Sequence, residues 1–296
     1  MIETTKIAPW ALASLSVSNM RAIPDHTSEL VSQVMMGTPL KVLDYKEKFY
    51  QVQTPEGYRG WLDAKGLELF CDDGMESWKN SPRCFYNRIA GYVYSYPDTK
   101  SDIVSDLVLG DLFVIEEENK DFRKSKLPDG RGGYVIKDEC LSFDEWISLP
   151  PDVDALITIA KKMMGFPYLW GGASSKATDC SGFTKLIFYS RGIILARDAS
   201  QQVKYGQPVY ISRLENLEKG DLLFFGNSAE RPGHVGIHLG NGDFIHSSGR
   251  VHISSIIPGN PKHDPDRNFV AARRILNALD TEGITSVGKN VWYVAG

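Results

Sequence analysis

Short apolar runs separated by turn residues follow one another through the first half of the chain. Residues 39–43 and 112–115 have the composition of β-strands. Turn signals follow at residues 55–57 and 128–130, where proline presets φ and glycine accepts a positive φ. The pattern predicts small β-barrels of about sixty residues each.

An internal repeat accounts for both sets of strands. The segment 28–65 matches the segment 101–138 without a gap, at a shift of 101 − 28 = 73 residues. Self-similarity at one fixed shift indicates that one supersecondary unit is used twice. Identical pairs include Ser28/Ser101, Val31/Val104, Gly37/Gly110, Phe49/Phe122, Pro55/Pro128 and Gly60/Gly133.

Two consecutive prolines end the repeat region, because they cannot continue a helix or a central strand. We therefore place a domain boundary near Pro150. Asp152 then has the character of an N-cap, and apolar residues recur at helical spacing over residues 156–163. The pattern predicts a helix that ends at Gly165.

Cys180 occupies the first turn of a second predicted helix. Asp179 precedes it as a capping residue, apolar residues follow at helical spacing, and Gly192 marks the end. Unpaired N–H groups and the positive end of the helix dipole stabilise a thiolate relative to a thiol at such a position. We therefore expect Cys180 to be a reactive nucleophile.

Two histidines on a predicted hairpin can serve this cysteine. Residues 233–239 and 243–247 alternate as strands, and a two-residue turn between them would point His246 away from His234. We predict a three-residue loop at 240–242, which places His234, His238 and His246 on one face. His234 and His246 then lie diagonally at about 7–8 Å. One imidazole can take the thiol proton while the other fixes its tautomer.

The remaining cysteines and histidines have ordinary structural explanations. A disulfide between Cys71 and Cys84 is conceivable from the spacing, but we expect free buried thiols. The residues predicted to be structural or exposed, with no chemical role, are Cys71, Cys84, Cys140, His26, His252 and His263.

Composition and charge exclude several classes of protein. The chain of 296 residues is 42% hydrophobic and 24% charged, with a net charge of −4, so it is neither disordered nor a basic nucleic-acid binder. No apolar run reaches the roughly 18 residues that cross a bilayer. Residues 1–6 lack the pattern of a signal peptide. We predict a soluble globular chain.

Six short motifs occur in order in the second half. They are YLWGG (168–172), DCSGF (179–183), RDASQQ (197–202), GDL (220–222), GHVGI (233–237) and IHS (245–247). Together they resemble the NlpC/P60 family of cell-wall cysteine peptidases. The repeat resembles bacterial SH3-like (SH3b) domains, most clearly at residues 20–24 and 57–61. The combination is similar to the γ-D-glutamyl-L-diamino acid endopeptidases.

The resemblance implies an α+β fold, with a papain-like catalytic domain preceded by two small SH3-like β-barrels. The expected bounds are 14–76 for the first SH3b domain and 82–147 for the second. The peptidase domain is expected at 150–276, followed by a C-terminal tail at 277–296.

The resemblance also implies roles for individual residues. Cys180 falls on the nucleophile, His234 on the general base and His246 on the third polar residue, and Tyr168 is placed to help hold the oxyanion. Arg197 and Asp198 are expected to bind a substrate ammonium group. The full set of expected substrate-binding residues is Tyr58, Trp170, Asp179, Ser181, Arg197, Asp198 and Ser200.

Three of these residues carry more specific expectations. Tyr58 is expected to close the end of the groove. Trp170 either walls the groove or packs in the core. Ser200, or Ser181, is expected to supply the hydroxyl group that some relatives have where this chain has Ala199.

The implied function is hydrolysis of the bond between γ-D-Glu and a diamino acid, meso-diaminopimelate or L-Lys, in murein stem peptides with a free N-terminal L-Ala. Such an enzyme serves peptidoglycan turnover or recycling, without a cofactor and as a monomer. The compartment is the periplasm or cell envelope if a leader was removed, and otherwise the cytoplasm. One alternative is a catalytically inert protein that binds the cell wall through its SH3b domains. Another is a zinc hydrolase that uses Cys180 and three histidines.

Overall fold

The computed structural model describes residues 8–295. The chain forms two compact units. Unit 1 runs to Trp146 and takes up the C-terminal residues from Asn290, and unit 2 is Ile147–Lys289. The division falls within a few residues of the boundary expected near Pro150. Residues 1–6, in which we found no signal-peptide pattern, lie outside the described residues.

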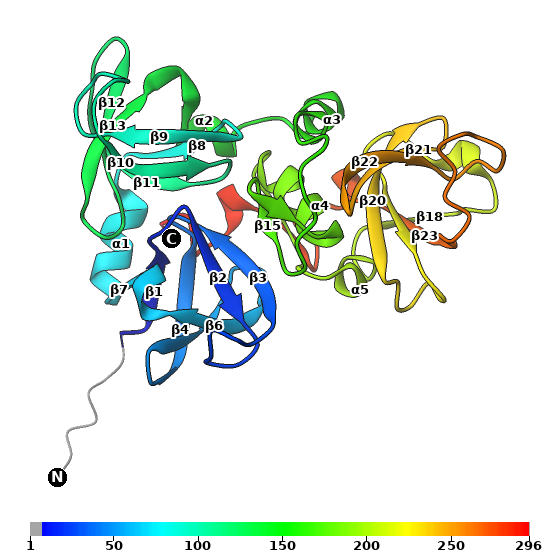
Figure 1. The fold of residues 1–296 in the computed structure, drawn as a ribbon, viewed down its shortest axis with the longest axis horizontal. Helices are drawn as coiled ribbons and strands as arrows, with labels where there is room; N and C mark the ends of the chain where they lie inside the picture. The colour runs from blue at the N-terminus through cyan, green and yellow to red at the C-terminus, as the bar shows by residue number, and fades with distance from the viewer. Residues whose placement is uncertain (1–7, 296) are drawn as a thin grey trace. The chain divides into compact units, whose positions relative to one another are not determined.

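The first half of unit 1 is a seven-stranded antiparallel sheet (Figure 1). Its strands are β1 (Trp10–Ala13), β2 (Val17–Arg21), β3 (Leu30–Met35), β4 (Pro39–Lys46), β5 (Phe49–Gln53), β6 (Arg59–Asp63) and β7 (Leu67–Phe70). They lie in the order β3-β2-β6-β5-β4-β1-β7, and helix α1 (Asp72–Asn80) follows.

The second half of unit 1 repeats this sheet. Its strands are β8 (Arg83–Tyr86), β9 (Ala90–Tyr94), β10 (Ile103–Val108), β11 (Leu112–Glu118), β12 (Phe122–Lys126), β13 (Gly132–Ile136) and β14 (Cys140–Ser142). The order β10-β9-β13-β12-β11-β8-β14 matches the first sheet strand for strand. The first strands start at Trp10 and Arg83, a shift of 83 − 10 = 73 residues. The predicted repeat is confirmed, and it begins at β1, before the expected start of the domain at Ser14.

Each sheet curls around its own core. In the first sheet, every strand contributes a buried apolar side chain to one cluster, which an open flat sheet could not bring together. The members are Ala11, Ala13, Met20, Val34, Leu40, Val52, Leu62 and Leu67. The predicted turns are present as well, since Gly57 and Gly130 both have a φ of 85°.

Buried hydrogen bonds to the carboxylate of Asp111 lie where the two sheets of unit 1 meet. Asp111 is fully buried and accepts hydrogen bonds from the N–H groups of Met36 at 3.0 Å and Val108 at 2.8 Å. Gly37 has a φ of 74°, and a Cβ atom there would lie 2.1 Å from the carbonyl oxygen of Leu112. This junction therefore requires glycine at position 37.

Unit 2 combines helices with a six-stranded antiparallel sheet in the order β18-β23-β19-β20-β21-β22. These strands are β18 (Gln207–Val209), β19 (Leu222–Phe225), β20 (His234–Gly240), β21 (Asp243–Ser248), β22 (Arg250–Ser255) and β23 (Phe269–Arg274). The other elements are α2 (Phe143–Ile147) at the junction of the units, α3 (Val153–Lys162), β15 (Ala173–Ser174), β16 (Ala177–Thr178), α4 (Cys180–Tyr189), β17 (Ile193–Leu195), α5 (Ala199–Gln202) and β24 (Ile284–Ser286). Short 3-10 turns lie at Ala64–Gly66, Lys137–Glu139, Leu214–Asn216, Leu276–Ala278 and Val287–Lys289.

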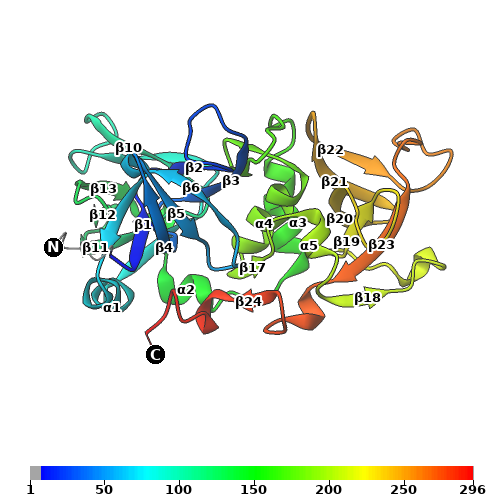
Figure 2. The same cartoon turned by 90° about the horizontal axis from the view of Figure 1, so that it is seen from below.

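Helix α4 packs against β20 and β21 (Figures 1 and 2). Nine of its ten residues are buried, so it is the central helix of unit 2. The predicted caps are confirmed, because Asp152 accepts from the N–H of Asp154 at 2.9 Å and Asp179 accepts from that of Gly182 at 2.7 Å. The α+β class is confirmed too.

The hairpin between β20 and β21 corrects the predicted loop length. The loop has two residues, Asn241 and Gly242, both with positive φ (54° and 77°), which is the turn that suits the twist of a hairpin. A bulge at Leu239 adds one residue to β20, so Ile237 pairs with Ile245. The predicted three-residue loop is wrong, but the predicted register is confirmed.

The free cysteines differ in exposure. Cys84 and Cys140 are buried as predicted, whereas Cys71 is exposed and corrects the prediction. Cys71 precedes the polar helix α1, which buries only Met75 and Trp78 and leaves its first turn at the surface.

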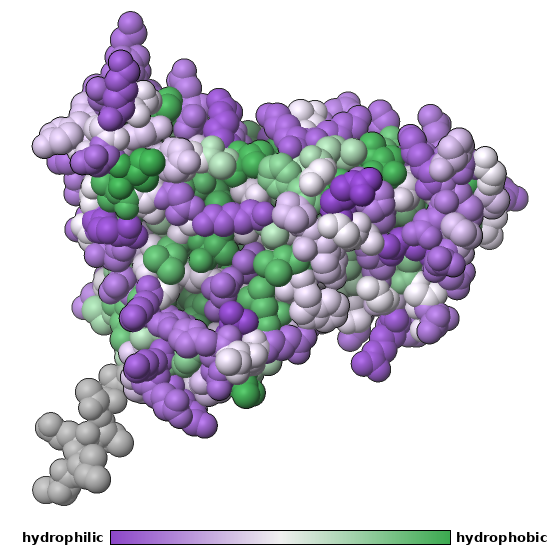
Figure 3. Space-filling model, in the orientation of Figure 1, coloured by the Kyte–Doolittle hydropathy of each residue, from purple (hydrophilic) through white to green (hydrophobic). Residues whose placement is uncertain are grey.

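The last residues also pack on the fold. In unit 2, β24 pairs with β17, and in unit 1 the ring of Trp292 lies edge-on against Trp10 at 5.3 Å. The face in Figure 3 is mainly hydrophilic, with separate small hydrophobic groups. Among the described residues, no helix is long and apolar enough to span a bilayer.

Candidate active site

Cys180 is the first residue of α4 and is 8% exposed. Its sulfur accepts hydrogen bonds from the backbone N–H groups of Ser181 and Val235. Val235 is on β20, directly after His234. The packing of α4 on the sheet therefore brings the thiol to the strand that carries the predicted base.

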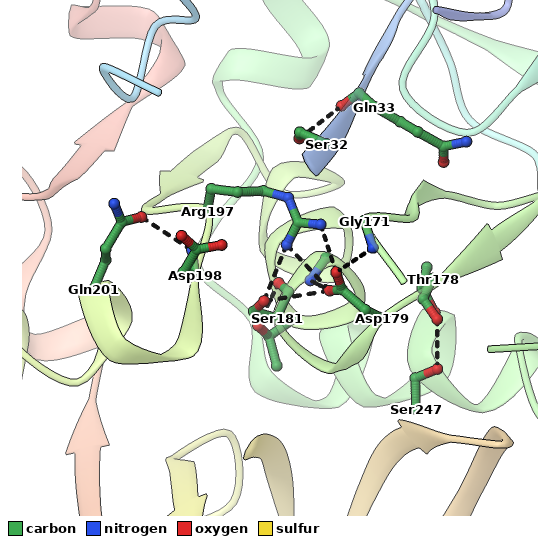
Figure 4. Close-up of polar contacts among 12 residues, drawn as sticks. Ser32, Gln33, Gly171, Thr178, Asp179, Ser181, Arg197, Asp198, Gln201 and Ser247 are labelled. Atoms are coloured by element: carbon green, nitrogen blue, oxygen red, sulfur yellow. Dashed lines mark hydrogen bonds and ion pairs between the residues drawn. The ribbon is translucent and has the colours of Figure 1, made fainter. Parts of the chain in front are cut away.

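The segment before α4 is held close to it by glycine. A Cβ atom at Gly182 would lie 2.0 Å from the carbonyl oxygen of Gly172, so only glycine allows this approach. The hydroxyl of Ser247 donates to the carbonyl of Thr178 at 2.8 Å (Figure 4). This contact ties the segment before Cys180 to β21, next to His246.

Three polar side chains form a continuous chain of contacts across the sheet. Nε2 of His234 lies 2.8 Å from Nδ1 of His246, and Nε2 of His246 lies 3.0 Å from the hydroxyl oxygen of Ser254. If Ser254 accepts from His246, then His246 accepts from His234. That leaves Nδ1 of His234 as the nitrogen that can take a proton.

Sequence reasoning missed two neighbours of His246 on β22. Ser254 is buried, and the ring of His252 lies 4.3 Å from that of His246, centroid to centroid. His252 pairs directly with His246 in the sheet. Alternation along β22 puts His252 and Ser254 on the face of His246, so extending the predicted hairpin by one strand would have found both.

The two imidazoles are held neutral. Burial lowers the pKa of His234 to about 3, assisted by the positive charges of Arg267 and His252. Burial also lowers the pKa of His246 to about 2, with further contributions from His234, His252 and Arg267. A neutral imidazole at ordinary pH is the form that can act as a base.

The cysteine is held as a thiol, which corrects the expectation of a resting thiolate. Burial raises the pKa of Cys180 to about 11, and the negative charge of Asp179 adds to the rise. The N–H groups of Val235 and Ser181 and the charge of Arg197 oppose it but are outweighed. At rest, therefore, both the thiol and the predicted base are uncharged.

The residues on either side of Cys180, Asp179 and Ser181, both contact the buried guanidinium of Arg197 (Figure 4). The guanidinium of Arg197, 1% exposed, donates to both carboxylate oxygens of Asp179 at 3.1 and 2.5 Å and to the hydroxyl of Ser181 at 3.0 Å. Asp179 also accepts from the N–H of Gly171 at 3.0 Å. These contacts join the YLWGG, DCSGF and RDASQQ motifs. The side chains of Asp179, Ser181 and Arg197, which we expected to bind substrate, therefore contact one another.

Tyr168 is half-buried and carries a phenol that stays protonated. Burial raises its pKa to about 12, and the negative charges of Cys180 and Asp179 add to the rise. The O–H group can therefore donate a hydrogen bond at any pH below about 12.

The other predicted substrate-binding residues are distributed over both units. Trp170 is 63% exposed, which excludes core packing for its side chain. Asp198 and Ser200 are half-buried at the start of α5, where the Asp198 N–H donates to the side chain of Gln201 at 3.1 Å. Tyr58 belongs to unit 1 and packs half-buried against the core of the first sheet.

The zinc alternative required His238 to share a site with the other two histidines. Instead its Nδ1 lies 2.9 Å from the carbonyl oxygen of Glu218, and its Nε2 accepts from the N–H of Gly242 at 3.3 Å. Both ring nitrogens are used by the backbone. Among residues 8–295, no three metal-binding side chains converge.

Comparison with known proteins matches both kinds of domain that the sequence resembles. A model of the NlpC/P60 family matches residues 165–264, and a model of the bacterial SH3 domain matches residues 16–68. The chain is 30% identical over 262 residues to a gamma-D-glutamyl-L-lysine dipeptidyl-peptidase of Bacillus cereus, covering 85% of this chain and 77% of that protein. It is 26% identical over 275 residues to dipeptidyl-peptidase 6 of Lysinibacillus sphaericus, covering 86% and 95%.

A solved structure shares the fold. The crystal structure of an NlpC/P60 family protein from Bacillus cereus matches with a TM-score of 0.77 and 24% identity, over 90% of this chain and 99% of that one. The fold of this chain is therefore a known one.

Proposed function

The chain belongs to the NlpC/P60 family of cysteine peptidases, and on this basis we propose that it hydrolyses the γ-D-Glu–diamino acid bond of murein stem peptides. The observation that carries the proposal is the 2.8 Å contact between Nε2 of His234 and Nδ1 of His246. His234 lies on β20, and the Cys180 sulfur accepts a hydrogen bond from the next residue of that strand, Val235. A nucleophile, a base and an orienting group are the parts that acyl transfer needs. The name of the Bacillus cereus relative directs this chemistry to γ-D-glutamyl peptides.

Acylation begins from the neutral pair. The Cys180 thiol gives its proton to Nδ1 of His234 as the sulfur attacks the side-chain carbonyl carbon of D-Glu. Because both groups are neutral at rest, the proton moves during the attack, and the imidazolium that forms is stabilised through His246. His234 then passes the proton to the leaving amine of the diamino acid, and a thioester remains on Cys180.

Deacylation reverses the roles. A water molecule gives a proton to His234 and attacks the thioester carbon, and the sulfur leaves with the proton that His234 returns. In both steps the negative charge on the carbonyl oxygen develops near the positive end of α4. We assign its stabilisation to the Cys180 N–H and the Tyr168 O–H.

Recognition of a free N-terminal L-Ala falls to Asp198. Of the two residues expected to bind the ammonium group, Arg197 is itself a cation and is paired with Asp179, so we assign the contact to the carboxylate of Asp198. A carboxylate that pairs with a desolvated ammonium discriminates strongly against an uncharged, acetylated amine. The Asp198→Asn variant should therefore raise KM for the free-amine peptide much more than it lowers kcat. It should also reduce the ratio of kcat/KM for the free-amine peptide to kcat/KM for the acetylated peptide.

The test is incubation with L-Ala-γ-D-Glu-L-Lys, its meso-diaminopimelate counterpart and the N-acetylated form of each, followed by mass spectrometry. We expect the free-amine peptides to be cut after γ-D-Glu and the acetylated ones to be cut far more slowly. The Cys180→Ala variant is the matched control and should be inactive. A protein that binds these peptides and cuts none of them would be the inert cell-wall binder instead, and equal turnover of both forms would refute the role of Asp198.

A further inference from the structure

A second pair of thiols lies in unit 1, in the second SH3-like sheet. Cys84 on β8 and Cys140 on β14 are both buried, and the Cys140 thiol donates a hydrogen bond to the sulfur of Cys84. In the sheet, Cys84 pairs with Ser142 and Cys140 with Tyr86. The two cysteines are therefore diagonal neighbours on one face of adjacent strands.

An arginine side chain is fixed against this pair. Nη1 of Arg123, from β12, lies 2.8 Å from the Cys84 sulfur and 3.3 Å from the carbonyl oxygen of Cys140. Its Nε atom donates to Glu118 at 3.2 Å, which orients the guanidinium. A guanidinium in contact with a sulfur favours the thiolate, the form that reacts with disulfides.

The two thiols differ in acidity as a result. The hydrogen bond from Cys140, with help from Arg123, lowers the pKa of Cys84 against the effects of burial and of Glu145. The same hydrogen bond raises the pKa of Cys140, and burial adds to the rise. Cys84 is therefore suited to attack a disulfide first, and Cys140 is suited to attack the mixed disulfide that results.

A cavity gives access to Cys84. It has a volume of about 470 Å³, and its lining includes Cys84, Arg123, Lys79, Arg83, Ser142 and Phe143. That volume is within the range of small-molecule sites. Three of these residues are cationic, and the carboxylates of Glu118 and Asp144 also line the cavity. While Cys84 is a thiol, the net charge of these side chains is 3 − 2 = +1, which suits an anionic ligand better than a cationic one.

We propose that Cys84 and Cys140 form a reversible dithiol site that is oxidised by small anionic disulfides. The Cys84 thiolate attacks one sulfur of the disulfide, the S–S bond breaks, and one half leaves as a thiolate that takes up a proton. Cys140 then loses its proton and attacks the Cys84 sulfur, which releases the second half as a thiol. The two cysteines lose two electrons, and the small disulfide becomes two thiols.

The fold can accommodate the new bond. A disulfide requires the sulfurs to approach to about 2.05 Å, closer than hydrogen-bonded thiols. β14 is a three-residue strand at the edge of its sheet, paired only with β8 in that sheet. Because β14 is paired on one side only, the approach of the two sulfurs has to change the pairing of β14 with β8 and no other strand pairing.

The test is incubation of the folded full-length chain with oxidised glutathione, followed by blocking of free thiols and peptide mapping without reduction. We expect a cross-linked peptide pair that contains Cys84 and Cys140 and is lost on reduction. The Cys140→Ser variant should instead keep glutathione on Cys84. The exposed Cys71 reports on general reactivity in the same samples.

Arg123 provides the matched control. Arg123→Gln should slow the capture of glutathione by Cys84 about tenfold, whereas Arg123→Lys, which keeps the charge, should slow it less. The proposal is overturned if glutathione reaches Cys71 while Cys84 and Cys140 stay unmodified in the folded chain, or if their cross-link forms only in denaturant. The wild-type result decides the matter even if a variant fails to fold.

Discussion

His246 is a buried imidazole whose two nitrogens both have partners, His234 on one side and Ser254 on the other. If one nitrogen of His246 donates a hydrogen bond, the other must accept one. The Ser254 hydroxyl therefore influences which nitrogen of His234 can take a proton. Burial keeps both rings uncharged, which makes them bases at ordinary pH.

Removal of Ser254 should impair this chain of contacts without removing a reacting group. We expect Ser254→Ala to lower kcat by about tenfold, with little change in KM. The loss is smaller than the full contribution of a positioned general base, because His234 itself remains. Ser254→Thr keeps the hydroxyl and should retain most of the activity. The measurement is the pH profile of kcat for all three proteins, and an unchanged profile in Ser254→Ala would show that the hydroxyl does not orient His246.

The raised pKa of Cys180 makes a separate prediction. Because the thiolate is disfavoured, alkylation of Cys180 by iodoacetamide should be slow at neutral pH. The rate should rise with pH until the pH passes the Cys180 pKa of about 11. Peptide mapping separates Cys180 from the exposed Cys71, which serves as the reference thiol. A rate that has already levelled off at neutral pH would mean that the resting site is a thiolate–imidazolium pair.

At the scale of elements, one bulge determines whether the two histidines meet. The turn at Asn241 and Gly242 alone would pair residue 246 with residue 237 and turn His246 to the opposite face. The extra residue at Leu239 restores the pairing of Ile237 with Ile245 and brings His246 beside His234.

Deletion of Leu239 should therefore abolish activity by shifting the register of β21. We expect a loss of at least a hundredfold in kcat/KM, since the base would lose its orienting partner. Leu239→Ala keeps the bulge and should stay active. Circular dichroism and thermal unfolding of both variants check that the fold survives, and a folded, active deletion variant would contradict the role of the bulge.

Much at this scale could be predicted from the sequence. The strands of the repeat and the pairing of His246 follow from local strand patterns. The caps at Asp152 and Asp179 follow from the type of residue that precedes each helical pattern. The bulge could not be predicted, because a two-residue turn plus a bulge and a three-residue loop produce the same register. The commitment of Arg197 to Asp179 was also missed, since an ion pair between residues 18 positions apart depends on how the motifs pack.

At the scale of the whole molecule, buried neutral histidines connect the active site to stability. The pKa values of His234 and His246, about 3 and about 2 in the folded protein, lie below the ordinary value of 6.5. The unfolded chain therefore binds more protons below pH 6.5. Stability is fully present above that pH and falls as the pH drops toward 3.

Acid should therefore destabilise the protein before its carboxylates titrate. Between pH 6.5 and 5 the two imidazoles together should reduce the free energy of unfolding by up to about 2.7 kcal/mol per pH unit. Urea unfolding at several pH values measures this slope, and the His234→Gln, His246→Gln double variant should show a much smaller one. An equal slope in the two proteins would place the acid sensitivity elsewhere.

The central claim is that Cys180 forms a covalent acyl-enzyme with the γ-D-glutamyl group. The most direct measurement is acid quenching during turnover of L-Ala-γ-D-Glu-L-Lys, followed by peptide mapping of the protein by mass spectrometry. We predict an L-Ala-D-Glu adduct on the peptide that contains Cys180, absent from Cys180→Ala. Turnover that proceeds without any adduct on Cys180, or that survives in Cys180→Ala, would contradict the account.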